Sequence, residues 1–363
     1  MLVFSVLGAI DYIIGCRFGI GKEFERGIML LGTMTLSMVG MIVLAPTIAY
    51  LLDPVLTLIA ENTPFEPSVL AGSLLANDMG GAPLAMEIAK TEMSGYFNGL
   101  VVGAMMGATI SFTLPLALGV TKKEQHKNIM LGLMCGIAAV PVGCFVSGLM
   151  VKMPMAELLI NIIPLVIFSV IIAIGLLKIP NVCVKIFNVF GIVIKTIIVI
   201  GLVVGIAAFL LDFEIPHTAP VEEGVMVVFN ASAVMTGAFP LLYIIGKLVK
   251  KPLGKLAGKI GINETSALGF VGSLATNVTT FGIMKDMDDK GVVLNSAFAV
   301  SAAFTFGGHL AFTIAFDSSY VLPVIIGKLV AGICGLILAL LLFEKRNKSE
   351  KAEATPSNLE LRT

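Results

Sequence analysis

One ionisable residue inside a long apolar stretch gives this sequence its clearest chemical signal. Asp78 lies in the segment Ala-Asn-Asp-Met-Gly-Gly-Ala-Pro, residues 76–83. Glycine and proline allow a sharp unwound turn there, and an ionisable group at membrane depth is functional by default because it is costly to place. A carboxylate at such a turn can pair with a cationic substrate or carry a proton, and it can also cap the helix that follows. We expect a functional role for Asp78 and keep capping as the alternative.

A second polar turn lies far along the chain, in the segment Ala-Thr-Asn-Val-Thr-Thr, residues 275–280. Thr276 and Asn277 offer hydroxyl and amide groups there, without a charge. These groups can bind a substrate hydroxyl, or they can close the backbone hydrogen bonds of the turn itself. Both interpretations stay open. Asn77, which precedes Asp78, offers an amide directly beside the carboxylate.

Further ionisable side chains inside apolar runs include a histidine and two lysines. His309 follows a Gly-Gly pair and can be either an interhelical hydrogen-bonding group or a proton relay; we favour the first. Lys195 and Lys328 lie within a turn or two of expected helix ends, where the lysine stem can carry its ammonium group to the interface. We therefore predict that both lysines reach the membrane surface, and we do not count them among the site residues.

These residues must be positioned by membrane helices. Only 13% of the 363 residues are charged and 57% are hydrophobic, whereas a soluble domain has roughly 25% charged residues. The sequence therefore predicts one all-α polytopic membrane domain over 1–343, followed by a polar, disordered cytoplasmic tail over 344–363. The apolar runs are 2–18, 27–52, 66–89, 95–118, 128–151, 156–177, 189–211, 224–245, 262–284, 291–316 and 320–343.

Two of these runs, 66–89 and 262–284, are interrupted by polar and small residues, and the positive-inside rule tests whether they cross the membrane. If both cross, the lysine clusters at 122–127, 178–185 and 247–259 fall outside. If both enter and leave on the same side, these clusters become cytoplasmic, together with the basic residues near both ends of the chain. The second arrangement predicts nine full spans and two re-entrant hairpins, with the N-terminus outside and the C-terminus in the cytoplasm.

The two interrupted runs also share a motif. Gly-Ser-Leu followed by asparagine occurs at 72–77 and again at 272–277. Together with the charge pattern, this predicts inverted repeats over about 2–151 and 189–343, joined by a linking span at 156–177. Inverted repeats with discontinuous elements at the midplane are typical of secondary transporters. The spaced glycines Gly99, Gly103 and Gly107 predict a span that another element, such as the first hairpin, can approach closely.

Other classes of function find little support in the sequence. The five cysteines are scattered without a Cys-x-x-Cys pair, so we interpret them as buried apolar residues and expect neither a disulfide nor a metal site. Nucleophile, phosphate-binding and zinc motifs are not found, which argues against an enzyme and against a cofactor. Aromatic residues are few and tryptophan is absent, while topology accounts for the basic loops, so we expect no nucleic-acid partner.

Several blocks of the chain together match the pattern of one known family. They are Leu-Ala-Gly-Ser-Leu-Leu-Ala-Asn-Asp-Met-Gly-Gly at 70–81, Met-Met-Gly-Ala-Thr-Ile at 105–110 with the Pro-x-Ala-Leu-Gly that follows, Met-Val-Gly-Met at 38–41 with the Ala-Pro that follows, and Pro-Val-Gly-Cys at 141–144. With these blocks the chain resembles the ethanolamine utilisation transporters named EutH, and the resemblance extends from the first span to the last. It implies uptake of ethanolamine across the bacterial cytoplasmic membrane.

Ethanolamine carries an ammonium group two carbons from a hydroxyl. We expect Asp78 to bind the ammonium through a charge-assisted hydrogen bond, with Asn77, Asn277 or Thr276 for the hydroxyl and His309 as a further candidate. Transporters built from hairpins and repeats are often homodimers, so a homodimer is one state to expect. The alternatives are a permease for another small solute, such as a different amino alcohol or a nucleoside, and a membrane component that transports nothing.

Overall fold

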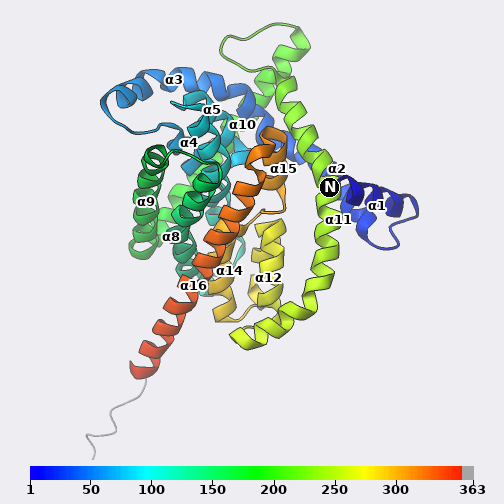
Figure 1. Ribbon diagram of the computed structural model, residues 1–363, viewed down its shortest axis with the longest axis vertical. Helices are drawn as coiled ribbons and strands as arrows, with labels where there is room; N and C mark the ends of the chain where they lie inside the picture. Colours follow the sequence, from blue (N-terminus) through cyan, green and yellow to red (C-terminus); the bar gives the residue numbers. More distant parts are fainter. Residues whose placement is uncertain (354–363) are drawn as a thin grey trace, which may run out of the picture.

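Helices follow one another along the described chain, as expected where lipid leaves no water to satisfy the backbone outside regular structure. The computed structural model describes residues 1–353, apart from the side chains of 59–61, 184, 249–257 and 348–353 (Figure 1). The α-helices are α1 (Leu2–Ile13), α2 (Ile20–Met34), α3 (Gly40–Asn62), α4 (Ser68–Leu74), α5 (Gly81–Ile88), α6 (Glu92–Tyr96), α7 (Leu114–Val120), α8 (His126–Met150), α9 (Met155–Lys178), α10 (Pro180–Leu211), α11 (Val221–Ile260), α12 (Glu264–Ala275), α13 (Asn277–Gly282), α14 (Asp289–Ala302), α15 (Gly308–Phe316) and α16 (Val321–Glu353). Short π-helical and 3-10 segments join or extend several of them, and no strand occurs within 1–353.

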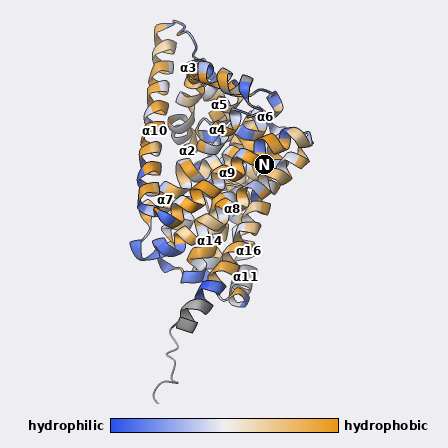
Figure 2. Cartoon of the chain, turned by 90° about the vertical axis from the view of Figure 1, so that its left-hand side faces the viewer, coloured by the Kyte–Doolittle hydropathy of each residue, from blue (hydrophilic) through white to orange (hydrophobic). Residues whose placement is uncertain are grey.

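Seven helical stretches of the described chain are long and apolar enough to cross a bilayer. They are Ile20–Leu58, Glu92–Val120, Lys123–Met150, Met155–Lys178, Pro180–Leu211, Val221–Leu248 and Ser318–Asn347. Each overlaps one of the predicted spans, and the all-α polytopic class is confirmed. Apolar residues run along the length of α10, while hydrophilic residues gather toward the two ends of the molecule (Figure 2). The exact number of spans stays a prediction.

The two interrupted runs form helix–turn–helix hairpins. In the first, α4 has 7 residues and α5 has 8, joined by the 3-10 turn η2 (Asn77–Met79). In the second, α12 has 12 residues and α13 has 6. Arms of this length span about 9–18 Å, which is too short for a hydrocarbon core of about 30 Å. The shared Gly-Ser-Leu motif lies in the last turns of α4 and α12, and the shared asparagine begins η2 and α13.

The run 291–316, predicted as one continuous span, is divided in the structure. α14 has 14 residues and α15 has 9, and residues 303–307 between them are not helical. Phe304 has a positive φ of 58°, which a bulky residue adopts only where its surroundings hold it. Its backbone N–H donates to the carbonyl oxygen of Ser273 at 2.9 Å, and that of Phe306 donates to Leu274 at 2.9 Å. The end of α12 therefore supplies the backbone hydrogen bonds that this break leaves open.

The first predicted run, 2–18, is helical only to Ile13. The turn that follows is closed by the buried Asp11 carboxylate, which accepts the backbone N–H groups of Phe18 at 2.9 Å and of Gly21 at 2.7 Å. A helix of 12 residues is about 18 Å long, shorter than a bilayer core. α1 instead packs beside α2 and α11 (Figure 1).

The glycine-spaced span is π-helical rather than α-helical. The π-helical segments η3 (Phe97–Gly107) and η4 (Thr109–Thr113) lie between α6 and α7 and are almost wholly buried. A methyl group on Gly107 would lie 1.8 Å from the carbonyl oxygen of Leu75, and one on Gly99 would lie 2.7 Å from Cα of Ala82. The prediction that these glycines admit the first hairpin is confirmed. π-Helical segments occur frequently at functional sites, and this one contacts both hairpins.

Hydrogen bonds and ion pairs gather several polar loops at one end of the molecule. Asn128 donates to Asp289 at 2.9 Å, and Lys290 pairs with Glu344 at 3.6 Å. The starts of α8 and α14 therefore lie beside the last turns of the membrane part of α16. α16 continues to Glu353, so the first ten residues of the predicted tail are helical, and residues 354–363 lie outside the described residues.

The predicted topology places this end in the cytoplasm. Glu124 lies at the same end, before α8, and Glu214 lies in the loop after α10; both side chains are exposed. With an impermeant thiol reagent added to intact cells, we expect Glu214→Cys to be labelled and Glu124→Cys to be shielded until the cells are opened. Wild-type protein, labelled in parallel, gives the background from the native cysteines. Labelling of Glu124→Cys in sealed cells would refute the re-entrant arrangement.

Candidate functional site

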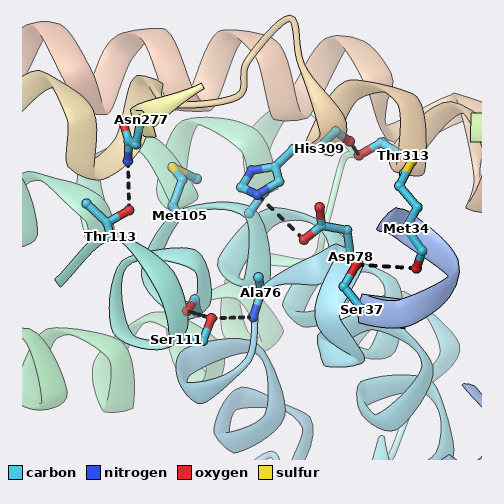
Figure 3. Close-up of polar contacts among 12 residues, drawn as sticks. Met34, Ser37, Ala76, Asp78, Met105, Ser111, Thr113, Asn277, His309 and Thr313 are labelled. Carbon is cyan, nitrogen blue, oxygen red and sulfur yellow. Dashed lines mark hydrogen bonds and ion pairs between the residues drawn. The ribbon is translucent and has the colours of Figure 1, made fainter. Parts of the chain in front are cut away.

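The tips of the two hairpins meet at one short segment, η4. Ser111 Oγ accepts a hydrogen bond from the backbone N–H of Ala76 at 3.2 Å, at the first tip, and Asn277 Nδ2 donates to Thr113 Oγ1 at 2.8 Å, at the second (Figure 3). Because Ser111 and Thr113 are next-but-one neighbours, the tips lie within about one helical turn of each other along η4. The buried π-helical span therefore holds both turns at one depth.

The break between α14 and α15 joins the same region and connects the two hairpins. On one side it pairs with the end of α12, as described above, and a methyl group on Gly307 would lie 2.1 Å from the carbonyl oxygen of Ala275. On the other side, α15 begins at the first tip, where a methyl group on Gly308 would lie 3.3 Å from Oδ2 of Asp78. Three interruptions of helical backbone thus converge. Sequence reasoning found the two hairpins and missed the break.

Asp78 differs from the two buried acids of the described chain, Asp11 and Glu66. The carboxylates of Asp11 and Glu66 each accept two backbone N–H groups at the ends of helices, which accounts for their burial. Asp78 is 22% exposed, and the ion pair found for its carboxylate joins Oδ1 to Nε2 of His309 at 3.7 Å. The N-cap of α5 is Gly80, in the left-handed conformation, without a side-chain cap. The structure therefore gives no support to the capping alternative.

His309 lies between Asp78 and a lysine, so that three ionisable groups form one buried row. Its Nε2 faces Asp78 (Figure 3). Its Nδ1 lies 3.1 Å from Nζ of Lys328. Lys328 also donates to the carbonyl oxygen of Ala104 in η3. A charged lysine has only donors, so Nδ1 of His309 must accept, and the ring proton then lies on Nε2, toward the carboxylate. In this arrangement the row carries no net charge.

The prediction that Lys328 reaches the membrane surface was wrong. Its side chain is fully buried, with 0% exposed, because α16 packs closely against α8 and η3. A methyl group on Gly143 would lie 2.3 Å from the carbonyl oxygen of Gly327, so the two helices touch through backbone just before Lys328. Lys195, by contrast, is exposed. A signal for Lys328 existed in the sequence, since a carboxylate at membrane depth calls for an opposite charge.

The remaining predicted site residues fall into two groups. Asn77 is fully buried, and neither its amide nitrogen nor its oxygen has a hydrogen-bond partner among the described residues. Thr276 caps α13 by accepting the backbone N–H of Val278 at 3.3 Å, and Asn277 also donates to the carbonyl oxygen of Ala299 at 3.2 Å. Asn77 therefore lies beside Asp78 with its amide unused, whereas Thr276 and Asn277 hold the second tip together.

A resident metal finds no obvious place in the described part of the chain. No group of three His, Cys, Asp or Glu side chains lies close enough there to hold a metal ion. The site offers ionic and hydrogen-bonding chemistry: a carboxylate, an imidazole and a lysine in a row, with an unpartnered amide on the residue that precedes the carboxylate.

Comparison with known proteins agrees over nearly the whole chain. The profile of the family described as ethanolamine utilisation protein, EutH, matches residues 1–342. A protein of Listeria monocytogenes named "Probable ethanolamine permease EutH" is 42% identical, with 97% of this chain and 95% of that protein covered. The protein of the same name from Salmonella typhimurium is 36% identical, with 98% and 97% covered. An uncharacterised Bacillus subtilis protein, YxeR, is 36% identical, with 92% and 90% covered.

No solved structure matches the chain. The family is shown by sequence alone, and the match begins in the first helix and ends within the last. Both hairpins, the π-helical span and the row of ionisable groups lie inside the matched residues. This chain belongs to the ethanolamine utilisation protein EutH family.

Proposed function

We propose that this protein is a permease for ethanolamine in the bacterial cytoplasmic membrane, and that it acts without catalysing a reaction. The relatives' names support a permease, and the seven apolar helical stretches support a multi-pass membrane protein. The observation that carries the proposal is Asp78, a carboxylate at the junction of the three helix interruptions whose described ion-pair neighbour is 3.7 Å away. That spacing is longer than a hydrogen bond and leaves the carboxylate able to accept a new donor.

The substrate's two polar groups match two side chains of the first tip, the Asp78 carboxylate and the Asn77 amide. The ammonium of ethanolamine binds the Asp78 carboxylate through charge-assisted hydrogen bonds, which are about twice as strong as neutral ones. The hydroxyl, two carbons away, binds the amide of Asn77, whose nitrogen and oxygen are free to donate and to accept. His309 borders the ammonium position, while Thr276 and Asn277 shape the second tip that closes over the site.

Transport follows from the arrangement of the two tips. In the predicted topology the first hairpin enters from outside and the second from the cytoplasm, so movement of one hairpin relative to η4 opens the site to one side at a time. The polar contacts that hold each tip to η4, at Ser111 and Thr113, are single hydrogen bonds. Such bonds contribute only about 0.5–1.5 kcal/mol each, which permits exchange between inward and outward states.

Uptake by the purified protein in proteoliposomes tests the proposal. We expect saturable uptake of labelled ethanolamine, with competition by unlabelled short amino alcohols and little competition by ethylene glycol, which lacks the ammonium, or by ethylamine, which lacks the hydroxyl. Competition by nucleosides at similar concentrations would indicate another permease on the same architecture. No saturable flux of any amine, together with no thermal shift on adding ethanolamine, would reject the permease itself.

A further inference from the structure

The row Asp78–His309–Lys328 contains two ionisable groups, an imidazole and a lysine, that a simple cation-binding site does not need. A carboxylate alone can bind an ammonium group, but here a fully buried lysine already supplies the opposite charge, through an imidazole that is itself 3% exposed. When a substrate ammonium binds at Asp78, the region would hold two positive charges and one negative. Because an uncompensated charge in a low-dielectric interior is very unfavourable, one positive charge must leave.

The geometry supplies a route for that charge as a proton. Lys328 Nζ–H donates to Nδ1 of His309, and Nε2–H of His309 faces Asp78. Nε2 and Oδ1 are 3.7 Å apart, so the second transfer requires the two groups to close to hydrogen-bond distance. Transfer of the first proton to Nδ1 and of the second from Nε2 to the carboxylate then yields a neutral lysine, a neutral imidazole with its proton on Nδ1, and a protonated Asp78. Every proton is accounted for, the row stays neutral, and one proton has moved from the buried lysine to the residue that borders the substrate position.

The groups packed around the row are poorer sources of this proton than Lys328. Besides Asp78, the titratable side chain that acts on Lys328 is Cys144 on α8. Its thiol is fully buried and has no contact with water. η3 contributes the carbonyl oxygen of Ala104, which can only accept. The ring of Phe304 lies 4.8 Å from that of His309, centroid to centroid, and covers the imidazole. The surroundings of Lys328 and His309 therefore offer no exchange of protons with water. The partly exposed Asp78 is the end of the row through which a proton can enter or leave.

We propose that ethanolamine and a proton are exchanged at this site: binding of the ethanolamine ammonium at Asp78 releases the proton held by the row through Asp78, and a proton returns to the row when the amine leaves. This inference rests on the proposed function, since it describes how the same site handles charge. Lys328 is a positioning residue that stores the exchangeable proton, and His309 carries it. The charge inside the protein then stays constant through the transport cycle.

The exchange determines which gradient across the membrane can drive the accumulation of ethanolamine. One ammonium moving in and one proton moving out transfers no net charge, so the membrane potential has no effect on the distribution reached at equilibrium. The pH gradient does have an effect: an interior one pH unit more acidic than the exterior gives about tenfold accumulation of ethanolamine. A carrier of the ammonium alone would respond in the opposite way, with about tenfold accumulation per 59 mV of inside-negative potential and no response to pH.

Wild-type protein tests the exchange directly. In proteoliposomes we expect accumulation with an acidic interior, unchanged by a potassium diffusion potential, and calorimetry in two buffers of different ionisation enthalpy should report release of about one proton per ethanolamine bound. Uptake that follows the potential, or binding without proton release, overturns the exchange while leaving a permease intact. Absence of any saturable binding or uptake overturns the proposed function instead, so the two failures are distinguishable.

Lys328→Met gives the matched variant. It keeps a long apolar stem and removes the stored proton, so at mildly alkaline pH, where the carboxylate without its lysine is ionised before the amine binds, uptake should become responsive to the potential. Under the same conditions, proton release on binding should fall from about one to near zero. Lys195→Met, at the exposed lysine of α10, makes the same substitution outside the row and should leave both readouts unchanged. A Lys328→Met protein that still releases one proton per ethanolamine at mildly alkaline pH overturns the assignment. If that variant does not fold, the wild-type measurements decide the question alone.

Discussion

Asp78→Asn is expected to abolish saturable ethanolamine uptake while the protein still folds and inserts. The substitution keeps the size of the side chain and removes its charge, so the ammonium loses its partner. A hydrogen bond to a charged group contributes about 1.5–3 kcal/mol net, and removing one member of a buried ion pair costs about 3–5 kcal/mol. We therefore expect kcat/KM for uptake to fall at least about a hundredfold.

A second consequence separates this loss from simple misfolding. Asp212→Asn makes the same chemical change at an exposed helix end with a φ of 51°, a conformation that asparagine tolerates, and should keep wild-type uptake. Detergent-purified Asp78→Asn should elute as wild type in size-exclusion chromatography. It should also lose the thermal shift that ethanolamine gives the wild type. Wild-type uptake by Asp78→Asn would remove the carboxylate from the mechanism.

Local sequence signals were sufficient to locate the two hairpins and to place Asp78 in the turn of the first. Glycine, proline and polar residues interrupt runs 66–89 and 262–284, and the lysines that flank these runs constrain which ends share a side. Both kinds of signal are contained within the segments concerned. The structure accordingly shows short helical arms there, with Asp78 in the turn of the first hairpin.

The break at 303–307 could not be predicted in the same way. Apart from Thr305 the segment is apolar, and it carries no charged residue. Its glycine pair alone is compatible with close helix packing. The backbone leaves the helix there because Ser273 and Leu274 accept the hydrogen bonds of Phe304 and Phe306. These acceptors belong to a different hairpin, so the decisive interaction is tertiary.

Lys328 was misplaced for a related reason. Position along an apolar run indicates how deep a residue lies in the membrane, but it does not indicate whether the side chain faces lipid or protein. Close packing of Gly327 against α8 turns Lys328 inward, and the carbonyl oxygen of Ala104 receives its ammonium. That carbonyl belongs to the π-helical η3, whose departure from α-helical pairing the glycine spacing alone does not specify.

Gly107→Ala tests whether the site depends on the close approach of the first hairpin to η3, and we expect it to eliminate transport and lower the melting temperature. The added methyl group would lie 1.8 Å from the carbonyl oxygen of Leu75 and 2.6 Å from that of Gly72. Both obstacles are backbone atoms, which cannot rotate away as a side chain can. The hairpin must move, at a cost of about 1–3 kcal/mol by analogy with overpacked cores.

The displacement would reach the site because Leu75 lies between α4 and the turn that carries Asp78. Moving Leu75 outward weakens the hydrogen bond from the Ala76 N–H to Ser111 and draws the Asp78 carboxylate away from His309, so uptake falls even in molecules that stay folded.

Gly119→Ala is the matched control: nothing lies within 4 Å of the added methyl group, and alanine in α7 should be neutral or stabilising by about 0.4–1 kcal/mol. Thermal unfolding in detergent and uptake in proteoliposomes measure the two effects separately. Normal uptake by Gly107→Ala would mean that the first hairpin can shift relative to η3 without loss of function. That result would contradict the proposal that η4 must hold both tips at one depth.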